Sequence, residues 1–254
     1  MPAGSPVPSL PLDDSGGPRR VLVVTAHPDD VDFGAAGTMA KWVAAGMEIA
    51  YCVVTDGDAG GSDRSVSRPE VAQLRRHEQR EAAAEVGVSE VTFLGYPDGK
   101  LAPSLELRRD VSRVVRQWRP DRLVCQSPER NWERVGASHP DHLAAGEAAV
   151  CSAYPDARNP FAHPELLDEG LEPHAVAEVW LMASPRPNRA VDITATFARK
   201  LSALRCHKSQ VAHEADLEGR LRSMGSTSAV LAGLPEGSAA ELFQVVAMPA
   251  SGSS

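Results

Sequence analysis

The chain of 254 residues carries a formal net charge of −8 at pH 7, with 43% hydrophobic and 24% charged residues. This composition is ordinary for a globular protein, and the length suffices for one sizeable hydrophobic core. The acidic balance argues against a surface for nucleic acid or an anionic membrane, and no stretch is long and apolar enough to span a bilayer.

The two ends of the chain differ in composition from the rest. Residues 1–19 are rich in Pro, Gly and Ser and lack the apolar core of a signal peptide, so we expect a flexible leader. Residues 249–254 are expected to form a flexible tail for the same reason. Residues 20–248 contain no internal repeat and no clear linker, and are predicted to form a single domain.

Short apolar segments alternate with longer amphipathic ones along this domain. The predicted strands span residues 20–26, 48–54, 91–94, 121–125, 178–183 and 242–247. The predicted helices span residues 35–45, 70–86, 105–118, 141–153 and 195–207. The alternation predicts an α/β fold, a Rossmann-like three-layer sandwich with a mostly parallel sheet. Ligands bind beyond the carboxyl ends of the strands in such a sheet, so the residues after each strand are the candidates for function.

The stretch AHPDDVDFG, residues 26–34, follows the first predicted strand. Pro28 favours an extended backbone at His27, so the strand continues to the histidine before the chain turns. A tight turn then brings His27 and Asp30, three residues apart, to one point, with Asp29 aimed at a neighbouring one. The alternative is an acidic turn that caps the next helix, with Asp32 as its N-cap.

A second histidine-rich stretch, SHPDH at residues 138–142, precedes the helix predicted at 141–153. The word His-Pro-Asp thus occurs twice, each time near the C-terminal end of a predicted strand, and the α/β geometry places both on one rim of the sheet. Two histidines and a carboxylate form a catalytic zinc site that leaves a position open for water. Either His139 and His142 both bind the metal, or one binds it and the other faces the substrate.

These motifs resemble those of the PIG-L/LmbE-like zinc-dependent deacetylases. That family includes the N-acetylglucosaminyl-phosphatidylinositol de-N-acetylases and the mycothiol-pathway deacetylase and amidase. The resemblance runs from about Val21 to Gln210 and rests chiefly on the paired HPDD and HPDH words. Weaker matches are TDGDAG (55–60), RRHEQREAAAEVGV (75–88), LGYPDGKL (94–101) and CHKSQ (206–210).

The resemblance implies a role for each matching residue. Three residues would bind zinc, with iron(II) as the alternative metal: His27, Asp30 and His142. Asp29 would be the general base. His139 would stabilise the oxyanion or protonate the leaving amine, with Asp141 hydrogen-bonded behind it. Arg75 would contact the substrate, and Asp98 would bind sugar hydroxyls.

The chain departs from the family's commonest motif, HPDDE, at Val31. The carboxylate that steadies the first histidine is therefore either displaced to Asp32 or absent. Two other residues leave alternatives open. His207 either hydrogen-bonds within the site or caps the C-terminal end of the helix at 195–207, and the cap is favoured. Trp132 either stacks on a sugar or packs in the core.

The motifs and the resemblance together predict a metal-dependent hydrolase that uses zinc-activated water to remove an N-acetyl group from a glucosamine-containing small molecule. The runner-up is an amidase that cleaves a larger acyl amide, such as a mycothiol S-conjugate. From another class, a nucleotide-binding Rossmann-like module is disfavoured because no glycine fingerprint follows the first strand. A non-catalytic module is disfavoured by the intact histidine and aspartate set. Four separated cysteines without a CxxC pair suggest reduced thiols and a cytoplasmic protein, and a homo-oligomer is left open.

Overall fold

The computed structural model of the chain describes residues 10–13, 20–61 and 65–248. Most of the expected leader, residues 1–9 and 14–19, and the whole expected tail, residues 249–254, lie outside the described residues. Residues 10–13 lie along one edge of the sheet, where the backbone N–H of Asp13 donates to the carbonyl of Ala190 over 2.9 Å.

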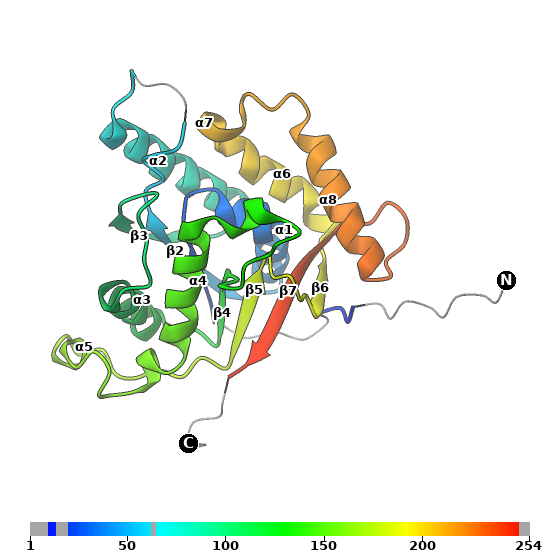
Figure 1. Cartoon of the computed structure of the whole chain (residues 1–254). Coiled ribbons are helices and arrows are strands. Elements are labelled where there is room, and N and C mark those ends of the chain that lie inside the picture. Colours follow the sequence, from blue (N-terminus) through cyan, green and yellow to red (C-terminus); the bar gives the residue numbers. More distant parts are fainter. Residues whose placement is uncertain (1–9, 14–19, 62–64, 249–254) are drawn as a thin grey trace.

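The centre of the fold is a seven-stranded sheet in the order β3-β2-β1-β4-β5-β7-β6. The strands are β1 (Arg20–Thr25), β2 (Glu48–Thr55), β3 (Glu90–Tyr96), β4 (Arg122–Gln126), β5 (Glu178–Met182), β6 (Arg189–Asp192) and β7 (Ala240–Ala247). The first five are parallel, whereas β7 pairs antiparallel with both β5 and β6. The predicted α/β fold with a mostly parallel sheet is confirmed (Figure 1).

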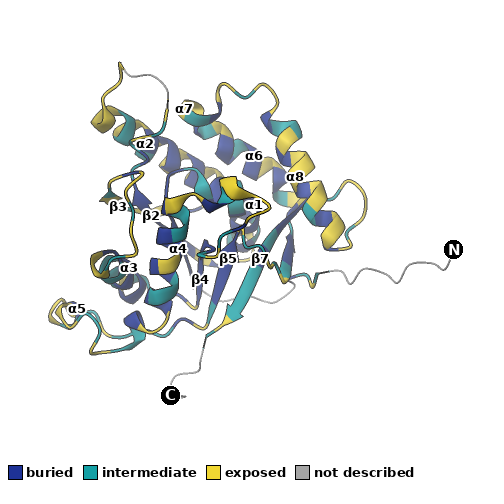
Figure 2. Ribbon diagram, in the orientation of Figure 1, coloured by how far each residue is buried: buried dark blue, intermediate teal, exposed yellow. Residues whose placement is uncertain are grey.

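Helices cover both faces of this sheet. They are α1 (Asp30–Ala44), α2 (Arg68–Val86), α3 (Leu105–Trp118), α4 (Pro140–Ala153), α5 (Glu165–Asp168), α6 (Phe197–Cys206), α7 (Lys208–Val211) and α8 (Leu217–Leu231). Side chains of β1 alternate between the two faces: Val21 and Val23 join the core under α1, α2 and α6, and Leu22 and Val24 join the core under α3 and α4. The central strands are accordingly dark and buried between helices with exposed outer faces, whereas much of β3 and β7 is half-buried (Figure 2).

Every strand and helix expected from the sequence is present, with shifted ends. The largest shift concerns α1, expected from residue 35 but beginning at Asp30, directly at the His-Pro-Asp turn. β6 and α8 are among the elements that the sequence did not predict. β6 has only four residues, and the Gly, Ser and Thr residues of α8 are weak helix formers.

Both His-Pro-Asp words lie where the strand order reverses. β1 is flanked by β2 on one side and β4 on the other, and such a switch point leaves a crevice at the carboxyl ends of the strands. Residues 27–30 follow β1, and residues 139–142 follow β4 through the 3₁₀ turn Val135–Ser138.

Among the helices of the described ranges, none combines the length and apolarity needed to cross a membrane.

Candidate active site

The first His-Pro-Asp word forms a closed turn after β1. The carboxylate of Asp30 accepts a hydrogen bond from the backbone N–H of His27 (2.7 Å) and lies 3.3 Å from His27 Nδ1. The turn thus brings the two side chains to one point, as their spacing predicts. Asp29, between them, adopts a left-handed backbone with φ of 93° and ψ of −26°, which is uncommon for a residue with a Cβ.

His142 meets the same carboxylate from the other His-Pro-Asp word. Its Nε2 lies 3.0 Å from Oδ1 of Asp30, and its Nδ1 lies 3.3 Å from the carbonyl oxygen of Ala137. A carbonyl accepts only, so Nδ1 carries a proton, and Nε2 is the nitrogen that faces Asp30. His27, Asp30 and His142 therefore converge, with Asp30 between the two imidazoles.

The outer nitrogen of His27 faces two further carboxylates. His27 Nε2 lies 3.1 Å from Asp98 Oδ1 and 3.3 Å from Asp141 Oδ2. The Asp141 carboxylate also accepts the backbone N–H groups of Gly99 (2.7 Å) and Leu101 (3.2 Å). Carboxylates that hold the outer nitrogen of a histidine fix the orientation of its metal-binding nitrogen. Asp98 and Asp141 are therefore placed to orient His27.

Asp141 is expected to be hydrogen-bonded behind His139, and the two residues do share a hydrogen bond, although the Asp141 carboxylate does not make it. The contact between the two residues is made by the backbone, because the N–H of Asp141 donates to Nδ1 of His139 over 3.2 Å at the start of α4. The Asp141 side chain is drawn instead to the N–H groups of the loop after β3. The His139 ring lies exposed at the rim, with its centroid 5.1 Å from that of His27.

The charges of this cluster favour a cation at the turn. Burial disfavours the charged form of His27, but hydrogen bonds and attraction from Asp30 and Asp98 outweigh it and raise the pKa of His27 to about 10. Burial also disfavours the ionised form of Asp30, yet attraction to His142 and His27 lowers its pKa well below the usual range. Carboxylates thus surround the imidazoles closely enough to stabilise positive charge between them.

Asp29 is held from two sides by α2. Arg75 Nη2 lies 3.1 Å from the Asp29 carboxylate, and Gln79 Oε1 accepts the backbone N–H of Asp29 over 2.8 Å. Burial raises the pKa of Asp29 to about 6, against the lowering effect of Arg75. Gln79 lies one helical turn after Arg75, so both point to the same side of α2. The sequence analysis missed Gln79, although this spacing was a usable signal.

Arg75 is itself buried, with 4% of its surface exposed. Besides Asp29 it donates to the carbonyl oxygens of Gly57 (2.8 Å) and Pro28 (2.6 Å). The guanidinium lies so close to the backbone of Gly57, where φ is 62°, that a Cβ there would collide with it. Arg75 therefore fastens the TDGDAG loop to the His-Pro-Asp turn.

Asp32 and His207 form a fully buried pair behind the turn. His207 Nε2 lies 2.8 Å from Asp32 Oδ2, and Gln79 Nε2 donates to the same oxygen over 2.9 Å. His207 is the C-cap residue of α6, as favoured from the sequence, and its ring also hydrogen-bonds within the site. Asp32 is not an N-cap because α1 already begins at Asp30.

Val31 is fully buried in the core. Asp32 bonds His207 and Gln79, and the carboxylates that contact His27 are those of Asp30, Asp98 and Asp141. The expected displacement of the steadying carboxylate to Asp32 is therefore not what the structure shows.

Trp132 lies in the loop between β4 and α4 and is 78% exposed. The interpretation that it packs in the core is wrong. The remaining alternative, that Trp132 stacks on a sugar, stays a prediction.

The donor set fits a divalent transition metal. Two imidazole nitrogens and one carboxylate match a catalytic zinc site with an open position, and the same set binds iron(II) in other enzymes. Nitrogens of His27, His139 and His142 also lie within 4.8 Å of one another. The ligand atoms of His27, Asp98 and Asp141 form a second such group. The assignment of His27, Asp30 and His142 as the metal ligands stays a prediction.

Comparisons with known proteins agree with this geometry. Residues 22–153 match the PIG-L family model, described as GlcNAc-PI de-N-acetylase. The diacetylchitobiose deacetylase of Thermococcus kodakarensis is 33% identical over 196 residues, which are 76% of this chain and 70% of that protein. A Streptomyces scabiei 1D-myo-inositol 2-acetamido-2-deoxy-alpha-D-glucopyranoside deacetylase is 32% identical over 73% of this chain and 62% of its own length.

A comparison with solved structures also finds a deacetylase of this kind. The solved structure of N,N'-diacetylchitobiose deacetylase from Pyrococcus horikoshii superposes with a TM-score of 0.83 and 32% identity, covering 91% of this chain and 84% of that one. With a family model that spans more than half of its residues, and with these relatives, the chain belongs to the PIG-L (GlcNAc-PI de-N-acetylase) family.

Proposed function

We propose that the protein is a metal-dependent hydrolase that removes the N-acyl group of a glucosamine-containing small molecule. Its relatives are named as deacetylases, which remove an N-acetyl group. The observation that carries this proposal is the convergence of His27, Asp30 and His142 beside Asp29 at the switch point of the sheet. The relatives, named as deacetylases of diacetylchitobiose and of an inositol glucosaminide, support the amide bond as the target.

The reaction is a hydrolysis. Water adds its oxygen to the acyl carbon, the C–N bond breaks, and the nitrogen takes a proton to leave as an amine. An ion held by His27, Asp30 and His142 would supply the Lewis acid that polarises the carbonyl and makes water more acidic. Zinc is the proposed ion, with iron(II) as the alternative.

Asp29 is proposed as the general base. Its Oδ2 is held by Arg75, and its strained backbone is held by Gln79, so the carboxylate is fixed next to the ligand turn. A base fixed in this way accepts the proton of the attacking water without reorganisation, which contributes about 10²- to 10⁴-fold to the rate.

His139 is proposed as the group that stabilises the oxyanion or protonates the amine. Its Nδ1 accepts the N–H of Asp141, so in the neutral ring the proton resides on Nε2. The exposed ring therefore offers an N–H donor from the rim of the site. A donor preorganised at the developing negative charge is among the strongest contributions to catalysis.

The sugar is proposed to bind on the β2–β3 side of His27. Asp98, which follows β3, and Arg75 on α2 are both there, and both are mostly buried. They are therefore placed to contact only the part of the sugar nearest the amide. Asp98 has oxygen lone pairs left for a hydroxyl beyond its bonds to His27 and to the N–H of Ala59.

The test is release of free amine from N-acetylglucosamine and diacetylchitobiose, before and after chelation. We expect chelation to abolish turnover and zinc or iron(II) to restore it. The variant Asp29→Asn should lose at least about 10²-fold in kcat while keeping its metal, whereas His142→Ala should lose metal. Asp168→Asn, on exposed α5, is the control for the charge change. Full turnover by chelated protein, or by metal-loaded Asp29→Asn, would refute the proposal.

A further inference from the structure

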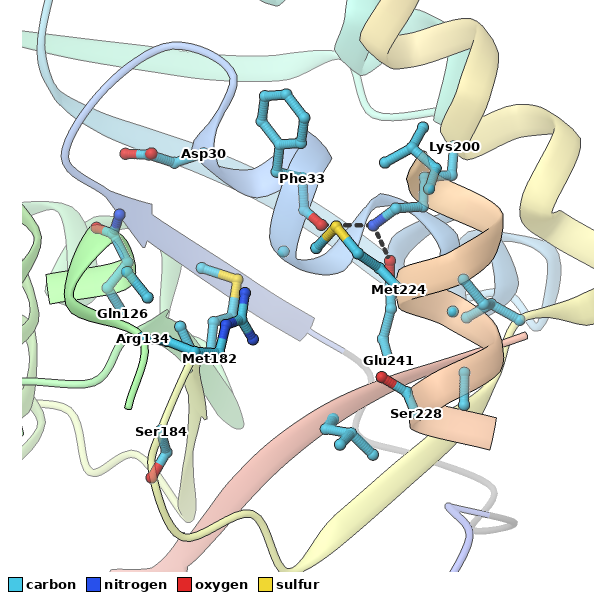
Figure 3. Close-up of a pocket in the computed structure, with 18 of the residues that line it drawn as sticks. Asp30, Phe33, Gln126, Arg134, Met182, Ser184, Lys200, Met224, Ser228 and Glu241 are labelled. Atoms are coloured by element: carbon cyan, nitrogen blue, oxygen red, sulfur yellow. Dashed lines mark hydrogen bonds and ion pairs between the residues drawn. The ribbon is translucent and has the colours of Figure 1, made fainter. Parts of the chain in front are cut away.

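A largely apolar cavity of about 270 Å³ adjoins the proposed ligands. It begins at Asp30 and His142 and extends between α1, β5, α6, α8 and β7 (Figure 3). Its apolar walls include Phe33, Met182, Ile193, Phe197, Leu221 and Met224. Two of these are methionines, whose flexible thioethers adapt to the shape of an apolar ligand.

The charged residues that line this cavity are largely neutralised by each other. Lys200 Nζ lies 2.6 Å from Glu241 Oε1 and also donates to the carbonyl of Phe33 over 2.6 Å. The other Glu241 oxygen accepts the N–H of Thr38 over 2.8 Å. Figure 3 shows this pair beside Met224. Lys200 and Glu241 thus hold α1 as a wall of the cavity and together add no net charge to it, whereas the charged residues Asp30 and Arg134 also line the cavity.

The opposite side of the site, towards β2 and β3, carries charged side chains next to His27. The strand order puts β2 and β3 on one side of β1 and the cavity's β5 and β7 beyond β4. A second pocket on the β2–β3 side is lined by the charged residues Asp56, Asp58 and Arg76 together with apolar ones such as Pro69 and Pro97. Asp58 Oδ1 accepts the backbone N–H of Asp98 over 3.2 Å, which links that pocket to the partner of His27. An amide bound at the ligands therefore has the carboxylates of Asp98 and Asp58 on one side and the cavity with its apolar walls on the other.

The size of the cavity exceeds what an acetyl group fills. An apolar cavity of about 150 Å³ holds a benzene molecule, so a cavity of this size suits an acyl group of about six to ten carbon atoms. Each methylene buried from water increases affinity by up to about fourfold.

We propose that this cavity binds the acyl part of the substrate, and that the protein prefers N-acyl groups of medium length to acetyl. The inference rests on the proposed function, since it assumes hydrolysis of an N-acyl glucosamine. The sugar lies on the polar β2–β3 side, and the alkyl chain passes Asp30 and His142 into the space between α1 and α8.

The test compares the metal-loaded full chain on N-acetyl-, N-hexanoyl- and N-octanoylglucosamine. We expect kcat/KM for the hexanoyl or octanoyl substrate to exceed that for the acetyl substrate at least tenfold. Ser228→Phe places a ring into the cavity from α8 and should lower the hexanoyl-to-acetyl ratio of kcat/KM at least tenfold. Ser226→Phe, an exposed position on the same helix outside the cavity lining, should leave that ratio within twofold of wild type.

The outcomes separate the two proposals. Hydrolysis of acetyl but not of longer substrates overturns the acyl-chain inference alone, as does an equal effect of Ser228→Phe on all chain lengths. If no N-acyl glucosamine is cleaved, the proposed function fails, and calorimetric titration with octanoate then decides about the cavity. Octanoate binding supports an apolar-chain site if Ser228→Phe weakens it at least tenfold and if the heat-capacity change is negative. Absence of octanoate binding refutes the site.

Discussion

The position of Asp29 depends on its backbone as much as on its carboxylate. A left-handed conformation is unfavourable by about 1–3 kcal/mol for a residue with a Cβ, and persists only where neighbours enforce it. Here the carbonyl of Asp29 accepts the N–H groups of Asp32 (2.9 Å) and Phe33 (3.0 Å), and its own N–H donates to Gln79. Gln79 also binds Asp32, so one amide group ties the turn to the buried pair behind it.

We therefore expect Gln79→Ala to impair the proposed base without removing the metal. The variant leaves the N–H of Asp29 and the carboxylate of Asp32 without this partner, and a buried hydrogen bond of this kind is worth about 1 kcal/mol or more. We expect kcat to fall about tenfold, with KM and metal content near those of wild type. Steady-state kinetics with metal analysis measures this. Gln117→Ala, exposed on α3, is the matched control, and loss of metal in proportion to activity would contradict a positioning role.

At this scale the sequence predicted the contacts that are close along the chain. His27 and Asp30 are three residues apart with a proline between them, so the turn that joins them follows from local geometry. The partner of Asp141 lies 42 residues away in the loop after β3, and that of Asp32 lies 175 residues away. Such contacts depend on how the elements pack, which is why the sequence did not show that the Asp141 carboxylate binds the loop after β3 or that the His207 ring binds Asp32.

Among the elements, α4 sets the position of His142. Gly146 lies one turn after His142, on the side of α4 that faces β4, and a Cβ there would collide with the carbonyl oxygen of Gln126. The absence of a side chain lets the helix approach the strand at the carboxyl end, where the ligands converge. Gly146 thus determines how close α4, and with it His142, lies to the carboxyl end of β4.

We expect Gly146→Ala to destabilise the protein although alanine favours helices. The helix preference of alanine would add about 0.5–1 kcal/mol, whereas overpacking against a backbone carbonyl is unfavourable by about 1–3 kcal/mol. The variant should therefore unfold at lower urea concentration and bind metal more weakly, since α4 carries His142. Gly136→Ala, where a Cβ meets nothing within 4 Å, is the control. A Gly146→Ala protein as stable as wild type would show that α4 does not need this close approach.

Of the elements around the cavity, α8 is the one that the sequence did not predict. α8 buries Leu217, Leu221, Gly225 and Ala229, which recur at every fourth position, but its many small and polar residues hide this pattern. Its first turn is stabilised by Asp216, whose side chain accepts the N–H of Gly219 over 2.9 Å. Packing on β7, rather than intrinsic propensity, therefore explains the helix.

Across the whole molecule, the parallel strand pairing around the ligands was predictable from the sequence. The pairing of the C-terminal strands was not. Alternating strands and helices over the first 150 residues imply parallel pairing, and so place both His-Pro-Asp words on one rim. The antiparallel pairing of β7 with β5 and β6 brings the C-terminal segment back beside the site, and nothing local in the sequence specifies it.

Lys200 and Glu241 join these distant parts. Lys200 on α6 and Glu241 on β7 form an ion pair that is about 5% exposed and is bonded to the backbone of α1. Removing one member of a buried ion pair leaves an uncompensated charge, which is unfavourable by about 3–5 kcal/mol. Exposed pairs such as Arg222 with Glu218 on α8 are instead worth about 0–1 kcal/mol.

We expect Lys200→Met to lower the free energy of unfolding by about 3–5 kcal/mol, because Glu241 then stays buried without its partner. The double variant Lys200→Met with Glu241→Gln should recover part of this loss, since the glutamine still accepts an N–H from α1 and carries no charge. Urea denaturation at pH 7 measures both, and Glu218→Ala, which breaks the exposed pair, should change stability by less than about 1 kcal/mol. Equal destabilisation by Lys200→Met and the double variant would mean that the pair acts through packing rather than charge.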